Sequence, residues 1–288
     1  MNVTVLGTGI MGSGIARSLA RGGLSVTAWN RTIARAEPLK KDGVLVEPDL
    51  HTALVHAEAV IIALYDADSV LDVLERSASY TPSNTIWIQT ATIGVEGTKR
   101  VADLAERDGL RVIETMMMGS KDQAAVGHLT LIGGGDPALF EQAKPVLDAM
   151  SFKLVHCGPQ LGDGTAVKLV CNLWLACITA AASQSIKLLE HQHVDPRLFL
   201  EVIDGATTDS PYAHIKGMKA ITHDFSPQFE VLALRKDLGL VGSVMESVGF
   251  RTDLLSTVTN LYDESISHEQ GHEDISVVSQ TFDEDSAH

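Results

Sequence analysis

The fold of this chain is decided by the stretch Asn2-Val-Thr-Val-Leu-Gly7-Thr-Gly-Ile-Met-Gly12. Its first five residues predict a short buried strand, and the apolar pattern after Gly12 predicts a helix that ends at Gly22. A second apolar run, residues 24–29, predicts the next strand. A strand, Gly-x-Gly-x-x-Gly, a helix and a strand are typical of a dinucleotide-binding βαβ unit, because glycines let the backbone approach a pyrophosphate and the helix N-terminus binds it.

The second strand is followed by Asn30-Arg31-Thr32. Enzymes that use NAD usually carry Asp or Glu about 20 residues after the glycines, because a carboxylate binds the ribose 2′-hydroxyl and repels a 2′-phosphate. Arg31 instead attracts a 2′-phosphate and can stack on the adenine. The sequence therefore predicts NADP as the cofactor, with NADPH preferred over NADH. The alternative is an ordinary turn with a solvated arginine.

Strands and helices continue to alternate through the first half of the chain. Strands are predicted at residues 59–64, 85–89, 111–114, 130–133 and 152–156, and helices at 95–108 and from 136 onward. After Gly162 the strand-like runs end and helical patterns dominate. We therefore predict an α/β, Rossmann-type dinucleotide-binding domain at residues 1–161, followed by an all-α C-terminal domain at residues 162–288.

The composition limits the partners and the compartment. The net charge of -15 argues against nucleic acid or an anionic membrane as partner. The longest apolar run, residues 169–182, is short for a membrane span. No signal peptide precedes the first strand, and the three cysteines show no metal spacing and are typical of thiols in a reducing compartment. We therefore expect a soluble, cytoplasmic protein.

A second informative stretch, Gly162-Asp-Gly-Thr-Ala-Val-Lys168-Leu-Val-Cys-Asn172, opens a long apolar helix. Lys168 and Asn172 lie four residues apart, so they share one face of this helix. Burial of a lysine in such a run is costly and lowers its pKa, which suits the amine to proton transfer near neutral pH. The alternative is a lysine that snorkels to solvent from a core helix.

Several motifs together resemble the β-hydroxyacid dehydrogenase family, which contains 3-hydroxyisobutyrate dehydrogenase and glyoxylate/succinic semialdehyde reductases. The motifs keep their order along nearly the whole chain: Gly7-Thr-Gly-Ile-Met-Gly12, Ala91-Thr92-Ile93, Lys168 with Asn172, Lys236-Asp237 and Gly271-His-Glu-Asp274-Ile-Ser. The resemblance implies reversible hydride transfer between NADPH and a small-molecule carbonyl or β-hydroxyacid-type substrate. It places the active site in a cleft between the two domains, and it gives residues 162–288 the roles of substrate binding and dimerisation.

The resemblance also implies roles for individual residues. Lys168 is the expected proton donor in reduction and acceptor in oxidation, and Asn172 is expected to hold the substrate or the lysine. The residues expected to bind the cofactor are Gly7, Thr8, Gly9, Ile10, Met11, Gly12, Asn30, Arg31, Thr32, Leu64, Tyr65, Thr92 and Lys236. The residues expected to bind the substrate are Thr92, Met118, Gly119, Ser120, Lys168 and Asn172.

The segment Glu114-Thr-Met-Met-Met118-Gly-Ser120 departs from the substrate loop of the family, which reads roughly Asp-Ala-Pro-Val-Ser-Gly-Gly. Met118 stands where the family has a serine that contacts the substrate, so the loop is more apolar and less suited to a small carboxylate. A methionine here is similar to the related imine reductases, which also favour Asn-Arg-Thr after the second strand. Those enzymes generally lack the lysine that this chain keeps as Lys168. The three methionines can equally be adaptable core filling.

Three function classes remain open. The first is an NADP-dependent oxidoreductase of carbonyl or hydroxyacid compounds, and the second is an NADPH-dependent imine reductase. The third is a non-catalytic nucleotide-binding protein, which would have no need of Lys168. The histidine pairs at 191 and 193 and at 268 and 272 lack a recognised ligand pattern, so no metal is expected. No nucleophile elbow supports a hydrolase.

The apolar helix also bears on assembly. Residues 166–189 are apolar nearly all round the helix, which predicts deep burial. A C-terminal domain of about 125 residues has limited material to cover such a helix by itself. Together with the family resemblance, this predicts at least a homodimer, formed through the C-terminal domain.

Overall fold

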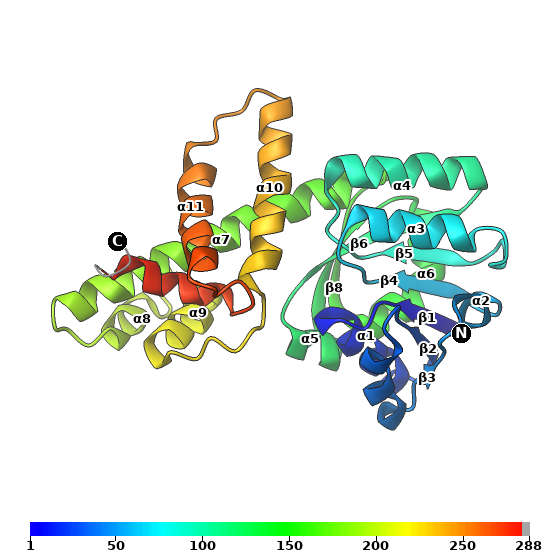
Figure 1. Cartoon of the computed structure of the whole chain (residues 1–288), viewed down its shortest axis with the longest axis horizontal. Helices are drawn as coiled ribbons and strands as arrows, with labels where there is room; N and C mark the ends of the chain where they lie inside the picture. Colours follow the sequence, from blue (N-terminus) through cyan, green and yellow to red (C-terminus); the bar gives the residue numbers. More distant parts are fainter. Residues whose placement is uncertain (284–288) are drawn as a thin grey trace. The chain divides into compact units, whose positions relative to one another are not determined.

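The computed structural model describes residues 1–283, and the chain divides into two compact units, one of residues 1–168 and one that starts at Leu169. The first unit is α/β and the second is all-α, so the predicted fold class is confirmed (Figure 1). The division falls inside helix α7 (Asp163–His191), later than the boundary after residue 161 that the sequence predicts. The start of α7 belongs to the first unit because its backbone N–H groups donate hydrogen bonds to the carboxylate of Glu114.

Within residues 1–283, eight strands form one sheet in the order β3-β2-β1-β4-β5-β6-β7-β8. The strands are β1 (Asn2–Leu6), β2 (Ser25–Trp29), β3 (Leu45–Val46), β4 (Ala59–Ile62), β5 (Ile86–Gln89), β6 (Arg111–Met118), β7 (Leu129–Gly134) and β8 (Ser151–Gly158). Neighbouring strands pair in parallel, except that β6 and β7 are antiparallel. Each strand predicted from the sequence is present, whereas the two-residue β3 was not predicted.

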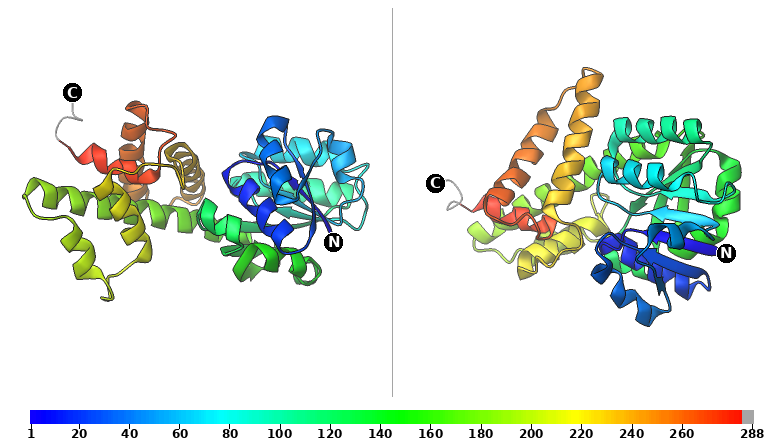
Figure 2. Two further views of the ribbon diagram at one scale, coloured as in Figure 1. Left: turned by 90° about the horizontal axis from the view of Figure 1, so that it is seen from below. Right: turned by 45° about the vertical axis from the view of Figure 1, so that its right-hand side comes forward.

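Helices cover both faces of this sheet (Figure 2). One face packs against α1 (Ile10–Arg21), α5 (Lys121–Val126), α6 (Pro137–Met150) and the 3₁₀-helices η1 (Ile33–Arg35) and η2 (Glu37–Asp42). The other face packs against α2 (Leu50–Leu54), α3 (Ala67–Ser77) and α4 (Gly94–Asp108). Ile61 belongs to the first core cluster, while Val60 and Ile62 belong to the second. A strand buried on both faces needs such a continuous apolar run.

The second unit is built around the larger part of α7. It contains α8 (Arg197–Ile203), α9 (Pro211–Thr222), α10 (Val231–Ser247), α11 (Asp253–Ser267) and the 3₁₀-helix η3 (Ile275–Phe282). Tyr262 of α11 is completely buried, and its hydroxyl donates to the carbonyl O of Ala176 in α7 at 3.3 Å. This contact fixes α11 against the central helix of the unit.

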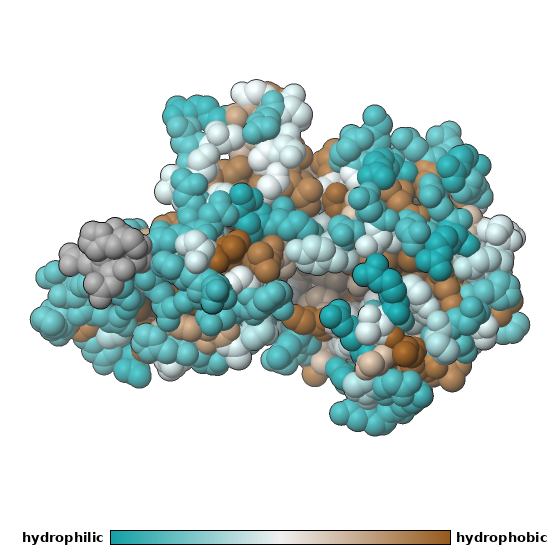
Figure 3. All heavy atoms as spheres, in the orientation of Figure 1, coloured by the Kyte–Doolittle hydropathy of each residue, from teal (hydrophilic) through white to brown (hydrophobic). Residues whose placement is uncertain are grey.

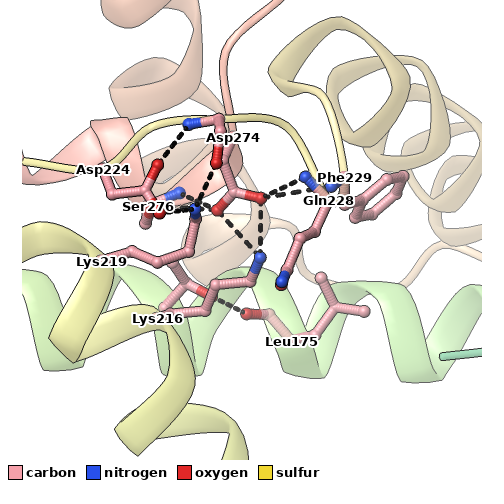
Figure 4. A network of polar contacts seen from close by, with 10 residues as sticks. Leu175, Lys216, Lys219, Asp224, Gln228, Phe229, Asp274 and Ser276 are labelled. Atoms are coloured by element: carbon pink, nitrogen blue, oxygen red, sulfur yellow. Dashed lines mark hydrogen bonds and ion pairs between the residues drawn. The ribbon is translucent and has the colours of Figure 1, made fainter. Parts of the chain in front are cut away.

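A buried ion pair ties the end of the described chain to the second unit. Nζ of Lys216, in α9, lies 2.8 Å from both carboxylate oxygens of Asp274, and the two residues are 2% and 0% exposed (Figure 4). Asp274 also accepts hydrogen bonds from the backbone N–H groups of Gln228, Phe229 and Ser276. The carboxylate thereby joins α9, the segment that precedes α10, and η3.

Within the single chain, helix α7 is buried along one face, and the burial of its other face against a second copy stays a prediction. Its buried face carries Lys168 and Asn172, whereas Val170, Trp174 and Leu188 are 67%, 65% and 61% exposed. By length and composition α7 could cross a membrane, and half of its most apolar window is buried inside the structure. On the face of the molecule drawn in Figure 3, most residues are hydrophilic, with smaller apolar areas between them.

Candidate active site

The turn from β1 to α1 requires glycine at two positions. Gly7 has a φ of 97°, and a Cβ built there would lie 2.4 Å from the carbonyl O of Ala63. A Cβ on Gly12 would lie 2.0 Å from the carbonyl O of Gly7. The turn therefore packs directly against the residue that follows β4. The strand order reverses between β1 and β4, which is where dinucleotides bind in sheets of this kind.

The first turn of α1 offers an open site for an anion. Gly9 is the N-cap of α1, no side chain caps the helix, and a Cβ built on Gly9 meets no atom within 4 Å. Ile10 is exposed and Met11 is half-buried. The hydroxyl of Thr8 is buried without a hydrogen-bond partner among the described residues. N–H donors at the positive end of a helix, beside open space and an unsatisfied hydroxyl, fit the phosphates of a dinucleotide.

Asn30 shapes this turn from the end of β2. Its Oδ1 accepts a hydrogen bond from the N–H of Thr8 at 3.3 Å, and its Nδ2 donates to the carbonyl O of Thr32 at 2.8 Å. Arg31 and Thr32 are exposed. The amide of Asn30 therefore connects the glycine turn to β2, and the adjacent guanidinium of Arg31 is accessible to a phosphate.

The other predicted cofactor residues of the first unit follow β4 and β5. Leu64 is half-buried and Tyr65 is 57% exposed. Thr92 is half-buried in the turn before α4. Gln89 holds this turn, because its Nε2 donates to the carbonyl O of Ala91 at 2.8 Å and its Oε1 accepts from the N–H of Ala91. Gln89 was not predicted as a site residue, since a polar residue at the end of a buried strand does not indicate which turn it holds.

Lys168 is buried against the end of β6. The residue is 8% exposed, its Nζ donates to the carbonyl O of Met117 at 2.7 Å, and it lies 3.5 Å from Sδ of Met118. The lysine does not extend to solvent, so the snorkelling alternative is wrong. The backbone carbonyl fixes the position of the amine, and the thioether supplies an apolar, polarisable neighbour.

Strand β6 continues through all three methionines, which corrects the expectation of a loop from 114 to 120. Met118 pairs with Thr130 of β7 in an antiparallel ladder. Met116 stands where the resembled loop has a proline. Unlike proline, methionine has a backbone N–H that can take part in such a ladder. Met116 is fully buried and fills the core, whereas Met117 and Met118 are half-buried. Core filling therefore describes Met116, and Met117 packs against the first core cluster, while Met118 contacts Lys168.

The two residues after β6 turn the chain into α5. Gly119 has a φ of 141°, in the region that favours glycine. Oγ of Ser120 accepts from the N–H of Gln123 at 3.3 Å, and Oε1 of Gln123 accepts from the N–H of Ser120 at 2.8 Å. Ser120 is thus the N-cap of α5 in a capping box. Its contact with a substrate stays a prediction.

In the second unit, Asn172 is part of a buried polar group. Asn172 is 0% exposed and Asp237, in α10, is 4% exposed. Nδ2 of Asn172 donates to Oδ2 of Asp237 at 2.6 Å, and Nζ of Lys236 lies 2.9 Å from Oδ1 of Asp237. Lys236 therefore forms an ion pair with Asp237, and its predicted contact with the cofactor stays a prediction. No separate role was predicted for Asp237.

One cluster of side chains that could bind a metal ion lies apart from the histidine pairs at 191 and 193 and at 268 and 272. Within residues 1–283, Asp204, Asp209 and His214 bring possible ligand atoms within 4.8 Å of one another. Nε2 of His214 lies 2.8 Å from Oδ1 of Asp209, and Oδ2 of Asp209 accepts from the N–H of Gly205. These contacts account for the arrangement as a partly exposed hydrogen-bonded Asp–His pair. The expectation of no metal stays a prediction.

Two sequence families match the chain, one in each half. Residues 2–158 match the NAD binding domain of 6-phosphogluconate dehydrogenase. Residues 162–282 match the family described as NAD-binding of NADP-dependent 3-hydroxyisobutyrate dehydrogenase. The two matches together include the glycine turn, Lys168 and Asn172.

Individual proteins are similar over almost the whole length. Glyoxylate/succinic semialdehyde reductase 2, chloroplastic, of Arabidopsis thaliana is 28% identical over 281 residues, which are 96% of this chain and 78% of the plant protein. Mycobacterium tuberculosis 3-hydroxyisobutyrate dehydrogenase, solved with L-serine, superposes with a TM-score of 0.87 at 27% identity, over 97% of this chain and 98% of that chain. An imine reductase from Pseudomonas sp. shares the fold, with a TM-score of 0.68 at 20% identity, over 98% of this chain and 99% of that chain.

Proposed function

The chain belongs to the β-hydroxyacid dehydrogenase family, and from this premise we propose that it reduces a carbonyl compound with NADPH, with Lys168 as the proton donor. As a member of this family it is an NAD(P)-dependent oxidoreductase. The observation that carries the finer proposal is the buried amine of Lys168, held 2.7 Å from the carbonyl O of Met117. A buried amine fixed in this way at the end of β6 supports a role in proton transfer.

The glycine turn and the end of β2 are the parts of the first unit that would hold the cofactor. The N–H groups of α1 beside Gly9 and the hydroxyl of Thr8 suit the pyrophosphate. Arg31 suits a 2′-phosphate, because a guanidinium forms charge-assisted hydrogen bonds to phosphate oxygens. When bound, the nicotinamide supplies or accepts the hydride. NADPH is therefore the proposed reductant.

Lys168 balances the charge that hydride transfer leaves on the substrate. In reduction, the protonated amine gives one proton from Nζ to the carbonyl oxygen, which becomes a hydroxyl, and the amine is left neutral. In oxidation, the neutral amine takes that proton back from the hydroxyl. The carbonyl O of Met117 accepts a hydrogen bond from Nζ and so holds the amine in place.

Asn172 follows Lys168 by one helical turn, so the two side chains leave α7 on the same side. Asp237 holds Nδ2 of Asn172. Oδ1 of Asn172 is buried and has no hydrogen-bond partner among the described residues. We propose that this oxygen accepts a hydrogen bond from the hydroxyl of the substrate or from Lys168.

Met118 supports a substrate that is less polar than a small hydroxyacid. Its Sδ lies 3.5 Å from Nζ of Lys168, and Met118 stands where the resembled family has a serine that contacts the substrate. A thioether donates no conventional hydrogen bond, and it adapts its shape to apolar groups. The same observation favours reduction of a cyclic imine as a second candidate function.

We further propose that the protein is a cytoplasmic homodimer that assembles through its second unit. Val170 and Trp174 leave an apolar stripe exposed on α7. The same unit has an apolar groove lined by residues that include Ile178, Phe199 and Ile203. A second copy of the chain is the proposed cover for these surfaces, since exposed apolar patches often mark interfaces.

A screen of NADPH oxidation tests the proposed function. Semialdehydes, 2-oxoacids and cyclic imines are offered to the wild type and to the Lys168→Ala variant. Turnover of a carbonyl compound that is lost in Lys168→Ala supports the proposal. Turnover of imines alone would favour the second candidate. Tight NADPH binding without turnover of any compound would favour the non-catalytic alternative.

A further inference from the structure

Glu114 is a buried carboxylate that the proposed chemistry does not use. It lies in β6 and is 0% exposed. Its Oε1 accepts hydrogen bonds from the backbone N–H groups of Gly162 at 2.8 Å, Gly164 at 2.7 Å and Thr165 at 3.1 Å. Its Oε2 accepts from the hydroxyl of Thr165 at 2.6 Å. The positive end of α7 therefore stabilises the carboxylate and offsets the cost of burying it.

Backbone atoms surround this carboxylate at close range. A Cβ built on Gly134, in β7, would lie 2.4 Å from Oε1 of Glu114. A Cβ built on Gly164 would lie 3.1 Å from the same oxygen and 2.8 Å from the carbonyl O of Ile132. Any side chain at these glycines would separate the start of α7 from the sheet. Glycine at 134 and 164 therefore allows the start of α7 to pack closely against the sheet.

Glu114 and Lys168 each connect β6 to α7. Glu114 does so at the first turn of the helix, and Lys168 does so about one turn later. Glu114 and Met117 are three residues apart on β6, and Thr165 and Lys168 are three residues apart on one face of α7. Oγ1 of Thr165 also lies 3.0 Å from Oγ1 of Thr98 in α4. The position of Thr165 sets the rotation of α7 about its axis, and with it the direction in which Lys168 leaves the helix.

We propose that Glu114 is a positioning residue that holds Lys168 at the end of β6 by fixing the first turn of α7. The proposal rests on the proposed function, in which Lys168 transfers the proton. Without the carboxylate, α7 can shift and carry Nζ away from the carbonyl O of Met117. A misplacement of about 1 Å can cost a hundredfold in rate. Binding of NADPH at the glycine turn is expected to stay unchanged.

Four variants and one control test this role. Glu114→Gln keeps the size of the side chain and removes its charge, and Glu114→Ala removes the acceptor. Thr165→Val removes one donor to Glu114, and Thr165→Ser restores the hydroxyl. The control is Thr85→Val, which deletes another buried hydroxyl of the first unit, one that donates to the carbonyl O of Ala57.

Two readouts separate positioning from a loss of folded protein. The first is kcat per NADPH-binding site, which corrects for the fraction of folded enzyme. The second is the ¹³Cε NMR signal of Lys168 in protein with labelled lysine, assigned by its loss in Lys168→Ala. This signal reports the surroundings of the amine and needs no substrate.

We expect Glu114→Gln to lower kcat per site between about tenfold and a hundredfold, with the affinity for NADPH unchanged. Thr165→Val should have a smaller effect that Thr165→Ser reverses, and the Lys168 signal should move in the impaired variants only. A Lys168 signal that stays in place in Glu114→Gln overturns the proposal, whether or not kcat falls. If Glu114→Ala does not fold, Glu114→Gln and the Thr165 variants decide. If the wild type turns over nothing, the proposed function fails, and the Lys168 signal still decides the role of Glu114.

Discussion

Nδ2 of Asn172 lies 2.6 Å from Oδ2 of Asp237, and both residues are buried. An ionised carboxylate can only accept hydrogen bonds, so it holds the amide with its nitrogen toward Asp237. Oδ1 of Asn172 is therefore fixed as an acceptor, and no donor satisfies it among residues 1–283. The pair gives the amide a single orientation.

Replacing Asp237 by Asn should remove this selection. An amide at 237 can present either its oxygen or its nitrogen to Asn172, so the orientation of Asn172 is no longer determined. We expect kcat to fall about tenfold to a hundredfold, the worth of a hydrogen bond to a charged group, while the affinity for NADPH holds. Steady-state kinetics with one carbonyl substrate measures this. An unchanged kcat would show that the orientation of Asn172 has no part in catalysis.

Two replacements of Lys168 distinguish a role in proton transfer from a role that needs only its positive charge. Lys168→Ala should lower kcat by roughly two to four orders of magnitude. Lys168→Arg keeps a positive charge, but its guanidinium does not release a proton, so the loss should be about as large. NADPH affinity should barely change in either variant, and exposed Lys144→Ala serves as the control. Activity within a few-fold of the wild type would mean that Lys168 is structural.

Arg31→Ala tests the preference for NADPH. The lost contact to a 2′-phosphate should weaken NADPH binding about tenfold to a hundredfold and leave NADH nearly unchanged, because NADH has a hydroxyl there. Fluorescence titration with both cofactors measures the two affinities. Arg76→Ala, which removes an exposed arginine paired with Asp72 on α3, is the matched control. Equal affinity of the wild type for the two cofactors would contradict the assignment.

Local geometry explains why part of the site could be predicted from sequence. The turn at Gly7 and Gly12 depends on neighbours within a few residues, and the spacing of Lys168 and Asn172 is fixed by one helix. The continuation of β6 through Met118 depends on pairing with Thr130, which no pattern within 114–120 reveals.

Two polar contacts could not be predicted from local sequence patterns, because each joins residues that are far apart in the chain. Glu114 and Thr165 are 51 residues apart, and Asn172 and Asp237 are 65 residues apart. Each of these side chains is ordinary in its own segment, and its partner is set only when the strands and helices pack. The sequence therefore indicated the residues that we propose to react and missed those that we propose to orient them.

The buried pair of Lys216 and Asp274 should matter for stability far more than an exposed pair. Lys216→Met leaves a buried carboxylate without its cation, which typically costs about 3–5 kcal/mol. The matched control is Lys144→Met, because Lys144 and Asp148 form an exposed pair on α6 worth less than about 1 kcal/mol. Urea unfolding followed by circular dichroism gives both free energies. Similar values for the two variants would argue against a stabilising role of the buried pair.

The same carboxylate predicts a loss of stability in acid. Burial opposes the charge of Asp274, but the ammonium of Lys216 and the N–H of Gln228 outweigh it and hold the pKa of Asp274 below its ordinary value. The stability that it contributes is therefore complete above about pH 4, the ordinary pKa of aspartate, and is lost as the pH falls through the lower native pKa. Asp274→Asn should be less stable than the wild type at pH 7, and the difference should shrink toward pH 3. A constant difference would contradict this linkage.

Met118→Ser tests what the methionine does to substrate choice. Sδ of Met118 lies 3.5 Å from the amine of Lys168. A serine at 118 would put a shorter side chain with a hydroxyl at the same position of β6, near the proposed proton donor. A hydrogen bond to a carboxylate is worth about 1.5–3 kcal/mol, or roughly tenfold to a hundredfold in kcat/KM for small acids such as glyoxylate. Bulkier, less polar carbonyl compounds should lose rate, because the adaptable thioether no longer packs against them. Competition between one substrate of each kind measures the change directly, with Met150→Leu, a fully buried core position in α6, as the control. Efficient turnover of 3-hydroxyisobutyrate or glyoxylate by the wild type, or an unchanged ranking in Met118→Ser, would leave Met118 as a packing residue without influence on specificity.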